Sequence, residues 1–149
     1  MDPPRRRVLL AEDDPSARKV LARVLADMGL EVVEAADGGR MLVAVTALYK
    51  GEHSPDELDL IVTDVSMPVL SGIDVLEGLR AAHWQTPVLW MTAQPDRREV
   101  REAVAMFGGV LLGKPFALDD FEATVKELLV RPRRRSRYIP PGTAPGGSL

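Results

Sequence analysis

Four apolar segments of this sequence each run directly into polar residues whose types could do chemistry. The first segment leads into the acidic pair Glu12 and Asp13, the second into Asp64, the third into Thr92 and the fourth into Lys114. If the segments are parallel strands, their carboxyl ends meet at one edge of a sheet, where open α/β folds bind ligands. We therefore expect these five side chains to lie close together.

The carboxylates in this set predict a divalent cation, because like charges repel and raise each other's pKa unless a cation neutralises them. Oxygen ligands alone suit Mg²⁺, which commonly takes one or two carboxylates and keeps water for a phosphate. An aspartate can accept a phosphoryl group, while Mg²⁺ and a lysine neutralise its charge and a hydroxyl donates a hydrogen bond. The set therefore predicts phosphoryl transfer to an aspartate.

The elements that position these residues follow from the hydrophobic pattern. Short apolar runs alternate with longer segments of helical period, which is typical of βαβ units and a mostly parallel sheet. Most runs lack polar alternation, as expected for strands covered by helices on both faces. The five expected strands are Arg7–Ala11, Leu30–Glu34, Leu58–Thr63, Pro87–Met91 and Val110–Leu112.

Capping residues predict where the helices begin. Asp14, followed by Pro15, is expected to begin the first helix, and Gly29 to end it. The later helices are expected to begin at Asp37, Ser71, Asp96 and Leu118, and the last to end at Val130.

Length and composition predict one globular domain. The chain has 149 residues, of which 46% are hydrophobic and 28% charged, a profile that excludes a wholly disordered protein. The absence of cysteine excludes disulfides, thiolate metal sites and a cysteine nucleophile. It also leaves no argument for an oxidising compartment, so we expect a cytoplasmic protein. No segment approaches the roughly 20 apolar residues that a transmembrane helix needs.

The C-terminal segment differs in composition from the rest. Residues 131–149 hold five of the 19 basic residues and no acid, so residues 1–130 carry 14 basic and 22 acidic groups, a net charge of −8. The segment is also rich in Pro, Gly and Ser and cannot bury much apolar area. We expect a domain over residues 1–130, with a polar surface loop at 51–57, and a basic, disordered tail over 131–149.

Four blocks of the sequence resemble the signature blocks of response-regulator receiver domains from two-component signalling, in the family's order. The resemblance covers most of the predicted domain and implies a flavodoxin-like, doubly wound α/β fold, in which five parallel strands take the order 2-1-3-4-5. The four blocks are Leu9–Asp14, Leu60–Pro68, Trp90–Ala93 and Gly113–Phe116.

The resemblance assigns roles to the acidic residues. Asp64 is the implied phosphoacceptor, which takes its phosphoryl group from a histidine kinase or a phosphotransfer protein. Glu12 and Asp13 are the implied acidic pair of a Mg²⁺ site. The ligands implied for the ion are the carboxylates of Asp13 and Asp64 and the backbone carbonyl of Ser66.

The resemblance also assigns roles to Thr92, as the hydroxyl that switches toward the phosphoryl group, and to Lys114, as the phosphate-binding lysine. A cis peptide is expected before Pro115. The family usually has an aromatic residue three positions before its lysine, but that position is Leu111 here. The resemblance therefore implies no coupling between Thr92 and an aromatic ring at position 111.

The implied function is that of a single-domain response regulator that signals by phosphorylation-dependent protein contact, on a surface formed by Gln94–Phe107, Val110–Leu112 and the last helix. Catalysis is limited to its own Mg²⁺-dependent phosphorylation and dephosphorylation. We expect no sequence-specific DNA binding, because the chain has no helix-turn-helix or other reader domain.

Two other functions fit part of the sequence. A receiver-like module that binds its partner without phosphorylation would explain Leu111, and in it Asp64 and Lys114 would form a structural salt bridge. A Mg²⁺-dependent phosphohydrolase with an aspartyl nucleophile would need a second catalytic acid and a cap domain, which the sequence does not supply. The arginine-rich tail fits either a solvated terminus or a segment that binds an anionic partner.

Overall fold

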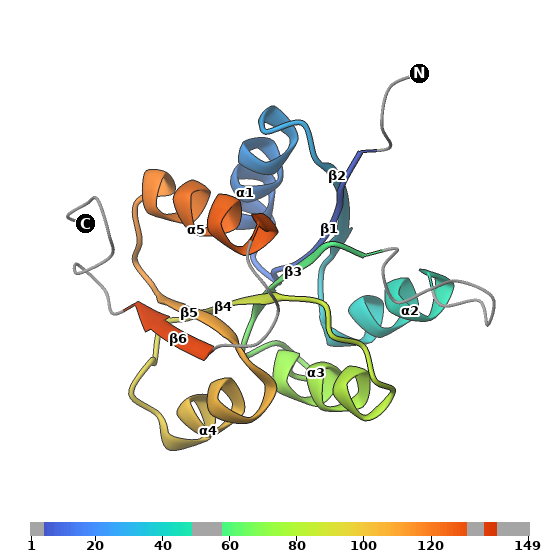
Figure 1. Ribbon diagram of the computed structural model, residues 1–149, viewed down its shortest axis with the longest axis vertical. Helices are drawn as coiled ribbons and strands as arrows, with labels where there is room; N and C mark the ends of the chain where they lie inside the picture. Colours follow the sequence, from blue (N-terminus) through green and yellow to red (C-terminus); the bar gives the residue numbers. More distant parts are fainter. Residues whose placement is uncertain (1–4, 49–57, 131–135, 140–149) are drawn as a thin grey trace.

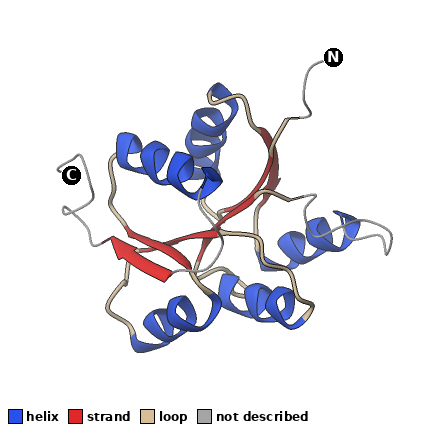
Figure 2. Ribbon diagram, in the orientation of Figure 1, coloured by secondary structure: helices blue, strands red, loops and turns tan. Residues whose placement is uncertain are grey.

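Six parallel strands form one sheet in the order β2-β1-β3-β4-β5-β6 (Figures 1 and 2). The computed structural model describes residues 5–48 and 58–130 and the backbone of 136–139. The predicted order of the first five strands and the doubly wound α/β class are confirmed. The strands are β1 (Arg7–Ala11), β2 (Glu31–Ala35), β3 (Leu60–Asp64), β4 (Val88–Thr92), β5 (Gly109–Gly113) and β6 (Ser136–Ile139).

Helices cover both faces of the sheet. On one face lie α1 (Pro15–Asp27) and α5 (Leu118–Val130); on the other lie α2 (Gly38–Leu48), α3 (Gly72–Ala81) and α4 (Arg98–Phe107) (Figure 1). Neighbouring strand residues face opposite layers, so Leu10 packs with the α1 and α5 side chains while Leu9 packs with those of α2, α3 and α4. This two-sided burial explains why the strands read as continuous apolar runs.

Three predicted caps are confirmed. In each, the side-chain oxygen of the capping residue accepts a hydrogen bond from the backbone N–H three residues further on, which satisfies an otherwise free donor of the first helical turn. Gly29, with φ +84°, follows α1 as predicted. The three pairs are Asp14 with Ala17, Asp37 with Arg40, and Ser71 with Asp74.

The predicted start of the fourth helix at Asp96 is wrong by two residues. Helix α4 begins at Arg98, and Arg97, at the capping position, makes no side-chain capping bond. The carboxylate of Asp96 instead accepts a hydrogen bond from Arg101 Nη2 at 3.0 Å, and Arg101 Nε donates to the carbonyl of Pro95. The arginine therefore holds the segment before α4 in a non-helical conformation.

The third and fourth strands end one residue later than predicted. Asp64 is the last residue of β3 and pairs in register with Met91, and Thr92 is the last residue of β4. Both site residues are thus anchored in the sheet instead of lying in the following loops. A strand position restricts the backbone of each residue more than a loop position would.

The C-terminal segment differs from the prediction. Residues Ser136–Ile139 form β6, which pairs with β5 in a parallel ladder, so the expectation of a disordered tail is wrong for these four residues. The edge of β5 offers unpaired backbone groups to any extended segment, and Tyr and Ile favour strands. The rest of the predicted tail, like the predicted loop at 51–57, lies outside the described residues.

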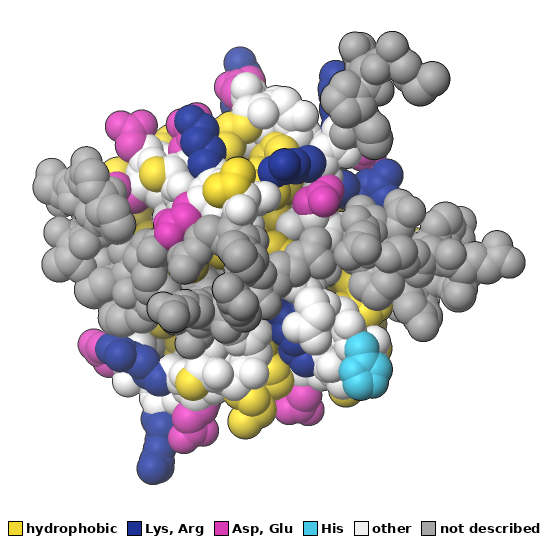
Figure 3. All heavy atoms as spheres, in the orientation of Figure 1, with side chains coloured by type: hydrophobic (Ala, Val, Ile, Leu, Met, Phe, Trp, Pro, Cys, Tyr) yellow, Lys and Arg dark blue, Asp and Glu magenta, His cyan; other side chains and the backbone are white. Residues whose placement is uncertain are grey.

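The described part of the surface carries mixed charge. On the face shown in Figure 3, Lys and Arg side chains lie among Asp and Glu side chains and do not gather into a patch of one sign. Among the described helices, none is both long and apolar enough to cross a membrane.

Candidate functional site

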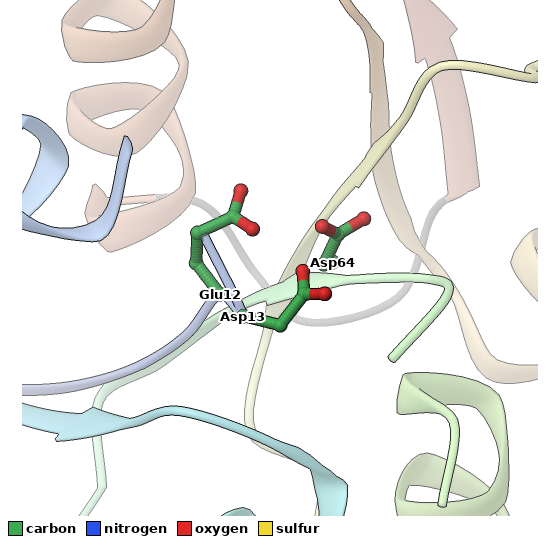
Figure 4. Close-up of side chains that lie close together, drawn as sticks. All are labelled: Glu12, Asp13 and Asp64. Carbon is green, nitrogen blue, oxygen red and sulfur yellow. The ribbon is translucent and has the colours of Figure 1, made fainter. Parts of the chain in front are cut away.

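Three carboxylates meet at the C-terminal edge of the sheet. Glu12 and Asp13 follow β1, and Asp64 ends the adjacent strand β3. One carboxylate oxygen from each residue lies within 4.8 Å of the others, and Figure 4 shows the three side chains converging. Glu12 and Asp64 are buried, whereas Asp13 is exposed. The predicted gathering of these acids is confirmed, and Asp13 gives the cluster an opening to solvent.

Lys114 joins the cluster from the end of β5. Its Nζ donates hydrogen bonds to Glu12 Oε1 at 2.8 Å and to Asp64 Oδ2 at 3.0 Å. The cis peptide expected between Lys114 and Pro115 is present. The lysine backbone N–H donates to the carbonyl of Thr92 at 2.7 Å. The ammonium group therefore sits between two buried carboxylates, while the backbone of the same residue is bound to the end of β4.

The two aspartates of the cluster titrate above their usual range. Burial raises the pKa of Asp64 to about 7, and the Glu12 charge adds to this rise while the Lys114 ammonium opposes it. Burial and then the neighbouring Glu12 carboxylate raise the pKa of Asp13 as well. Burial is the main cause of both shifts and the Glu12 carboxylate adds to each, so Lys114 does not fully offset the cost of charging the two aspartates.

Glu12 and Lys114 behave as a matched ion pair. Burial alone would raise the pKa of Glu12, but hydrogen bonds from Lys114 and from the backbone N–H of Asp14 outweigh it and leave that pKa below its ordinary value. Burial alone would lower the pKa of Lys114, but Glu12 and Asp64 outweigh it and raise that pKa. The lysine therefore stays cationic and Glu12 stays anionic.

The cluster fits a divalent cation by its chemistry. All donor atoms are carboxylate oxygens, and the raised pKa values of Asp13 and Asp64 are what a bound cation would reverse. Ser66, two residues after Asp64, is exposed in the loop that follows β3. That the backbone carbonyl of Ser66 is a ligand of the metal stays a prediction.

Thr92 lies at the end of β4, between the strands that carry Asp64 and Lys114. Its side chain is buried, and Oγ1 accepts a hydrogen bond from the backbone N–H of Gln94 at 3.0 Å. Accepting this bond leaves the hydroxyl proton available for donation. The residue can therefore serve as a hydrogen-bond donor to a group held on Asp64.

Sequence reasoning missed residues that hold the acids in place. The Thr63 hydroxyl donates to the carbonyl of Asp64 at 2.9 Å, and Arg18 Nη1 donates to the carbonyl of Glu12 at 2.8 Å. A Cβ on Gly72 would lie 2.4 Å from the same Asp64 carbonyl oxygen. The glycine next to the predicted cap Ser71 was the one available signal, since only a residue without a side chain allows this approach.

Comparison with known families agrees with this geometry. Residues 8–126 match the model of the response regulator receiver domain. The chain belongs to the receiver-domain family. Its acidic cluster and lysine therefore occupy the edge of a signalling module of two-component systems.

Curated relatives of this receiver domain include chemotaxis and transcriptional regulators. It is 34% identical over 125 residues to chemotaxis protein CheY-3 of Vibrio cholerae, an alignment that covers 83% of this chain and 88% of the relative. It is 36% identical over 146 residues to transcriptional regulatory protein TcrA of Mycobacterium tuberculosis, covering 96% of this chain. The chain spans 52% of TcrA and 47% of YrkP of Bacillus subtilis, so it matches only part of these relatives.

Solved receiver structures share the fold. A Vibrio cholerae chemotaxis protein, CheY4, superposes with a TM-score of 0.70 at 27% identity, covering 85% of this chain and all of that one. The receiver domain of the hybrid histidine kinase CckA superposes with a TM-score of 0.65 at 30% identity, covering 83% of this chain and 98% of that one. The five-stranded part of the sheet is therefore that of a receiver domain.

Proposed function

We propose that this receiver domain takes a phosphoryl group on Asp64 from a phosphohistidine of a histidine kinase or phosphotransfer protein. In this step a carboxylate oxygen of Asp64 forms a bond to phosphorus as the bond from phosphorus to the imidazole nitrogen breaks. The imidazole leaves with the electron pair of the broken bond. The observation that carries the proposal is the Lys114 ammonium 3.0 Å from Asp64 Oδ2, at the place where phosphoryl charge would develop.

The neighbouring side chains supply the rest of the chemistry. Asp13 and Asp64 would hold Mg²⁺ with the Ser66 carbonyl, and Glu12 would complete the acidic pair. A bound Mg²⁺ supplies positive charge to the phosphoryl oxygens. The Lys114 ammonium neutralises a further oxygen, and the Thr92 hydroxyl donates a hydrogen bond to the phosphoryl group once it forms. Turnover is confined to phosphorylation and loss of the group from Asp64.

The proposed output is a change in protein contact made by this receiver domain, which we place in the cytoplasm. Thr92 precedes the segment that leads to α4, and Lys114 follows β5. Movement of either residue toward a phosphoryl group would therefore act on these two elements. A target protein that binds Gln94–Phe107, Val110–Leu112 or α5 would sense the change through a shift in a two-state equilibrium.

The test is intact mass spectrometry after incubation with Mg²⁺ and acetyl phosphate. Wild-type protein should gain a single labile phosphoryl group, and Asp64→Asn should gain none. Asp119→Asn, which removes an exposed carboxylate from the first turn of α5, is the matched control and should react like the wild type. A wild-type protein that gains no phosphoryl group, while a control receiver does, would favour a module that binds its partner without phosphorylation.

A further inference from the structure

The C-terminal strand β6 lies on the two elements that lead away from the proposed switch residues. Its main neighbours are β5 and α4, and Figure 1 shows it beside β5 at the edge of the sheet, next to α4. Helix α4 follows Thr92 through residues 93–97, and β5 runs directly into Lys114. Changes at Thr92 or Lys114 therefore have a short path to β6.

The connection into β6 differs from the other connections in the sheet. The chain passes from β1 to β2 through α1, on the face that also carries α5. From β3 to β4 it moves in the opposite direction across the sheet, through α3 on the opposite face, which gives the same hand. From β5 to β6 it keeps that second direction but passes through α5, on the α1 face, which gives the opposite hand.

This reversal bears on how firmly β6 is held. Crossovers between parallel strands have one hand in about 98% of cases, because the twist of the strands favours it. The other crossovers of this sheet share one hand, and the β5-α5-β6 connection has the opposite, disfavoured hand. Strand β6 is also short, with four residues paired to β5. Strand β6 is thus added at the edge of the five-stranded receiver fold, and the connections among those five strands do not require it.

We propose that the edge formed by β5 and α4 is a strand-docking surface, that its occupant in the unphosphorylated protein is the chain's own segment Ser136–Ile139, and that a phosphoryl group on Asp64 weakens this docking. The coupling rests on the proposed function, but the docking does not. In the arrangement with β6 docked, Thr92 Oγ1 is bound by the Gln94 N–H and Lys114 is bound to Asp64.

A phosphoryl group would change both of those contacts. The Thr92 hydroxyl would turn toward it, which takes Oγ1 away from the Gln94 N–H at the start of the segment before α4. The Lys114 ammonium would move to a phosphoryl oxygen, which acts on the end of β5. Since β6 contacts both elements, its docked state would be favoured in the unphosphorylated arrangement. By linkage, removal of β6 should then favour the phosphorylated arrangement to the same degree.

The first experiment measures docking alone, by amide hydrogen exchange without Mg²⁺ or a phosphoryl mimic. A double variant, Arg137→Pro with Tyr138→Pro, removes two adjacent N–H groups; alternate residues of a strand face a given neighbour, so one of the two must face β5. Amides of β5 that face β6 should exchange about tenfold faster or more in this variant. Equal exchange in wild type and variant would overturn the docking.

The matched control is Gly146→Pro with Gly147→Pro, which adds two prolines to the same tail outside β6 and should leave β5 exchange unchanged. Should the first variant fold poorly, Tyr138→Gly with Ile139→Gly weakens the strand through backbone entropy and keeps every N–H group. It should show the same acceleration of exchange in a smaller degree. No acceleration in a folded glycine variant would equally overturn the docking.

The second experiment measures coupling, by titrating each protein with beryllofluoride in the presence of Mg²⁺. The proline variant should bind this phosphoryl mimic about fivefold more tightly or better than the wild type and the control, the lower end of usual coupling between two sites. Equal or weaker binding by the proline variant would overturn the coupling. The docking itself would still be decided by the hydrogen-exchange experiment. Absence of binding in every protein would instead refute phosphoryl acceptance by Asp64, and with it the coupling.

Discussion

Lys114 Nζ lies 3.0 Å from Asp64 Oδ2, yet the pKa of Asp64 is raised to about 7. The lysine is shared with Glu12, which it contacts at 2.8 Å and whose carboxylate keeps its charge. The buried edge of the sheet therefore carries one cation for two close carboxylates, with Asp13 beside them. Removing the charge of Asp64, or adding a cation at the cluster, should therefore stabilise the fold.

The first prediction concerns the pH dependence of stability in metal-free buffer. The folded-state pKa of Asp64, about 7, lies above its ordinary value of 3.8. The folded protein therefore holds a proton that the unfolded chain has released, and this contribution to stability is complete below the ordinary pKa and lost as pH rises through about 7. Asp64→Asn should lack this loss. The free energy of unfolding of Asp64→Asn, relative to that of the wild type, should therefore rise by about 1 kcal/mol or more between about pH 5 and about pH 8.

The measurement is denaturant unfolding of both proteins with a chelator present. Asp119→Asn, which removes an exposed carboxylate, provides the control and should follow the wild-type pH curve. If the wild type and Asp64→Asn lose stability in parallel across this range, the pKa of Asp64 is not raised in the folded protein.

The second prediction concerns Mg²⁺. An ion that binds the folded chain stabilises it by mass action, by about 2.7 kcal/mol at a concentration a hundredfold above its dissociation constant. We expect thermal unfolding of the wild type to shift upward with Mg²⁺, and Asp13→Asn to lose most of the shift because it removes the exposed carboxylate of the cluster. Asp27→Asn, on the exposed part of α1, should keep the full shift. An Asp13→Asn protein that responds to Mg²⁺ like the wild type would exclude this carboxylate from the site.

Much of the site could be predicted because its chemistry is set by local sequence. Apolar runs that end in Glu12, Asp64, Thr92 and Lys114 define strands and strand ends at once, and parallel strands bring those ends together. The helix caps were equally local, since Asp14, Asp37 and Ser71 each bind a backbone N–H three residues away. These features need no knowledge of distant partners.

The features that could not be predicted depend on competition between distant or alternative partners. Asp96 looks like a cap, but Arg101 binds its carboxylate instead. Strand β6 depends on the open edge of β5, more than twenty residues earlier in the chain. The raised pKa of Asp64 depends on how Lys114 divides its hydrogen bonds between two acids. None of these outcomes follows from a local pattern.

The third prediction concerns Leu111, which stands where the family usually has an aromatic residue. Leu111 pairs in register with Trp90, and both are buried in the same core cluster, where Trp90 Nε1 donates to the Gly108 carbonyl. The tryptophan thus fills space on this face of the sheet. Leu111→Phe should overpack the cluster and cost about 1–3 kcal/mol of stability.

Trp90→Leu should cost about 3 kcal/mol by leaving a cavity and an unpaired carbonyl. Because each change opposes the other in volume, the double variant should be more stable than the sum of the single effects by about 1 kcal/mol or more. Leu112→Phe combined with Trp90→Leu is the control, since Leu112 faces the other core cluster and the two effects should add. Additivity in both pairs would show that Trp90 does not occupy the space an aromatic ring at position 111 would need.

The last prediction compares two glycines of α3. A Cβ on Gly72 would lie 2.4 Å from the Asp64 carbonyl oxygen and 2.8 Å from Thr63 Oγ1, whereas one on Gly78 would meet nothing within 4 Å. Gly72→Ala must therefore push the start of α3 away from the end of β3, at a cost of about 1–3 kcal/mol. Gly78→Ala should stabilise the exposed helix interior by about 0.5–1 kcal/mol.

The two variants should also differ in chemistry. Because the displaced backbone carries Asp64, phosphorylation of Gly72→Ala by acetyl phosphate should slow by about tenfold or more, since small misplacements of a reacting group have large effects on rate. Gly78→Ala should react at the wild-type rate. Rates measured by intact mass at a temperature where both variants are fully folded separate this effect from stability. A Gly72→Ala protein that is destabilised but reacts at full rate would mean that the close approach of α3 to β3 serves the fold alone, and that Lys114 and Thr63 suffice to position the carboxylate.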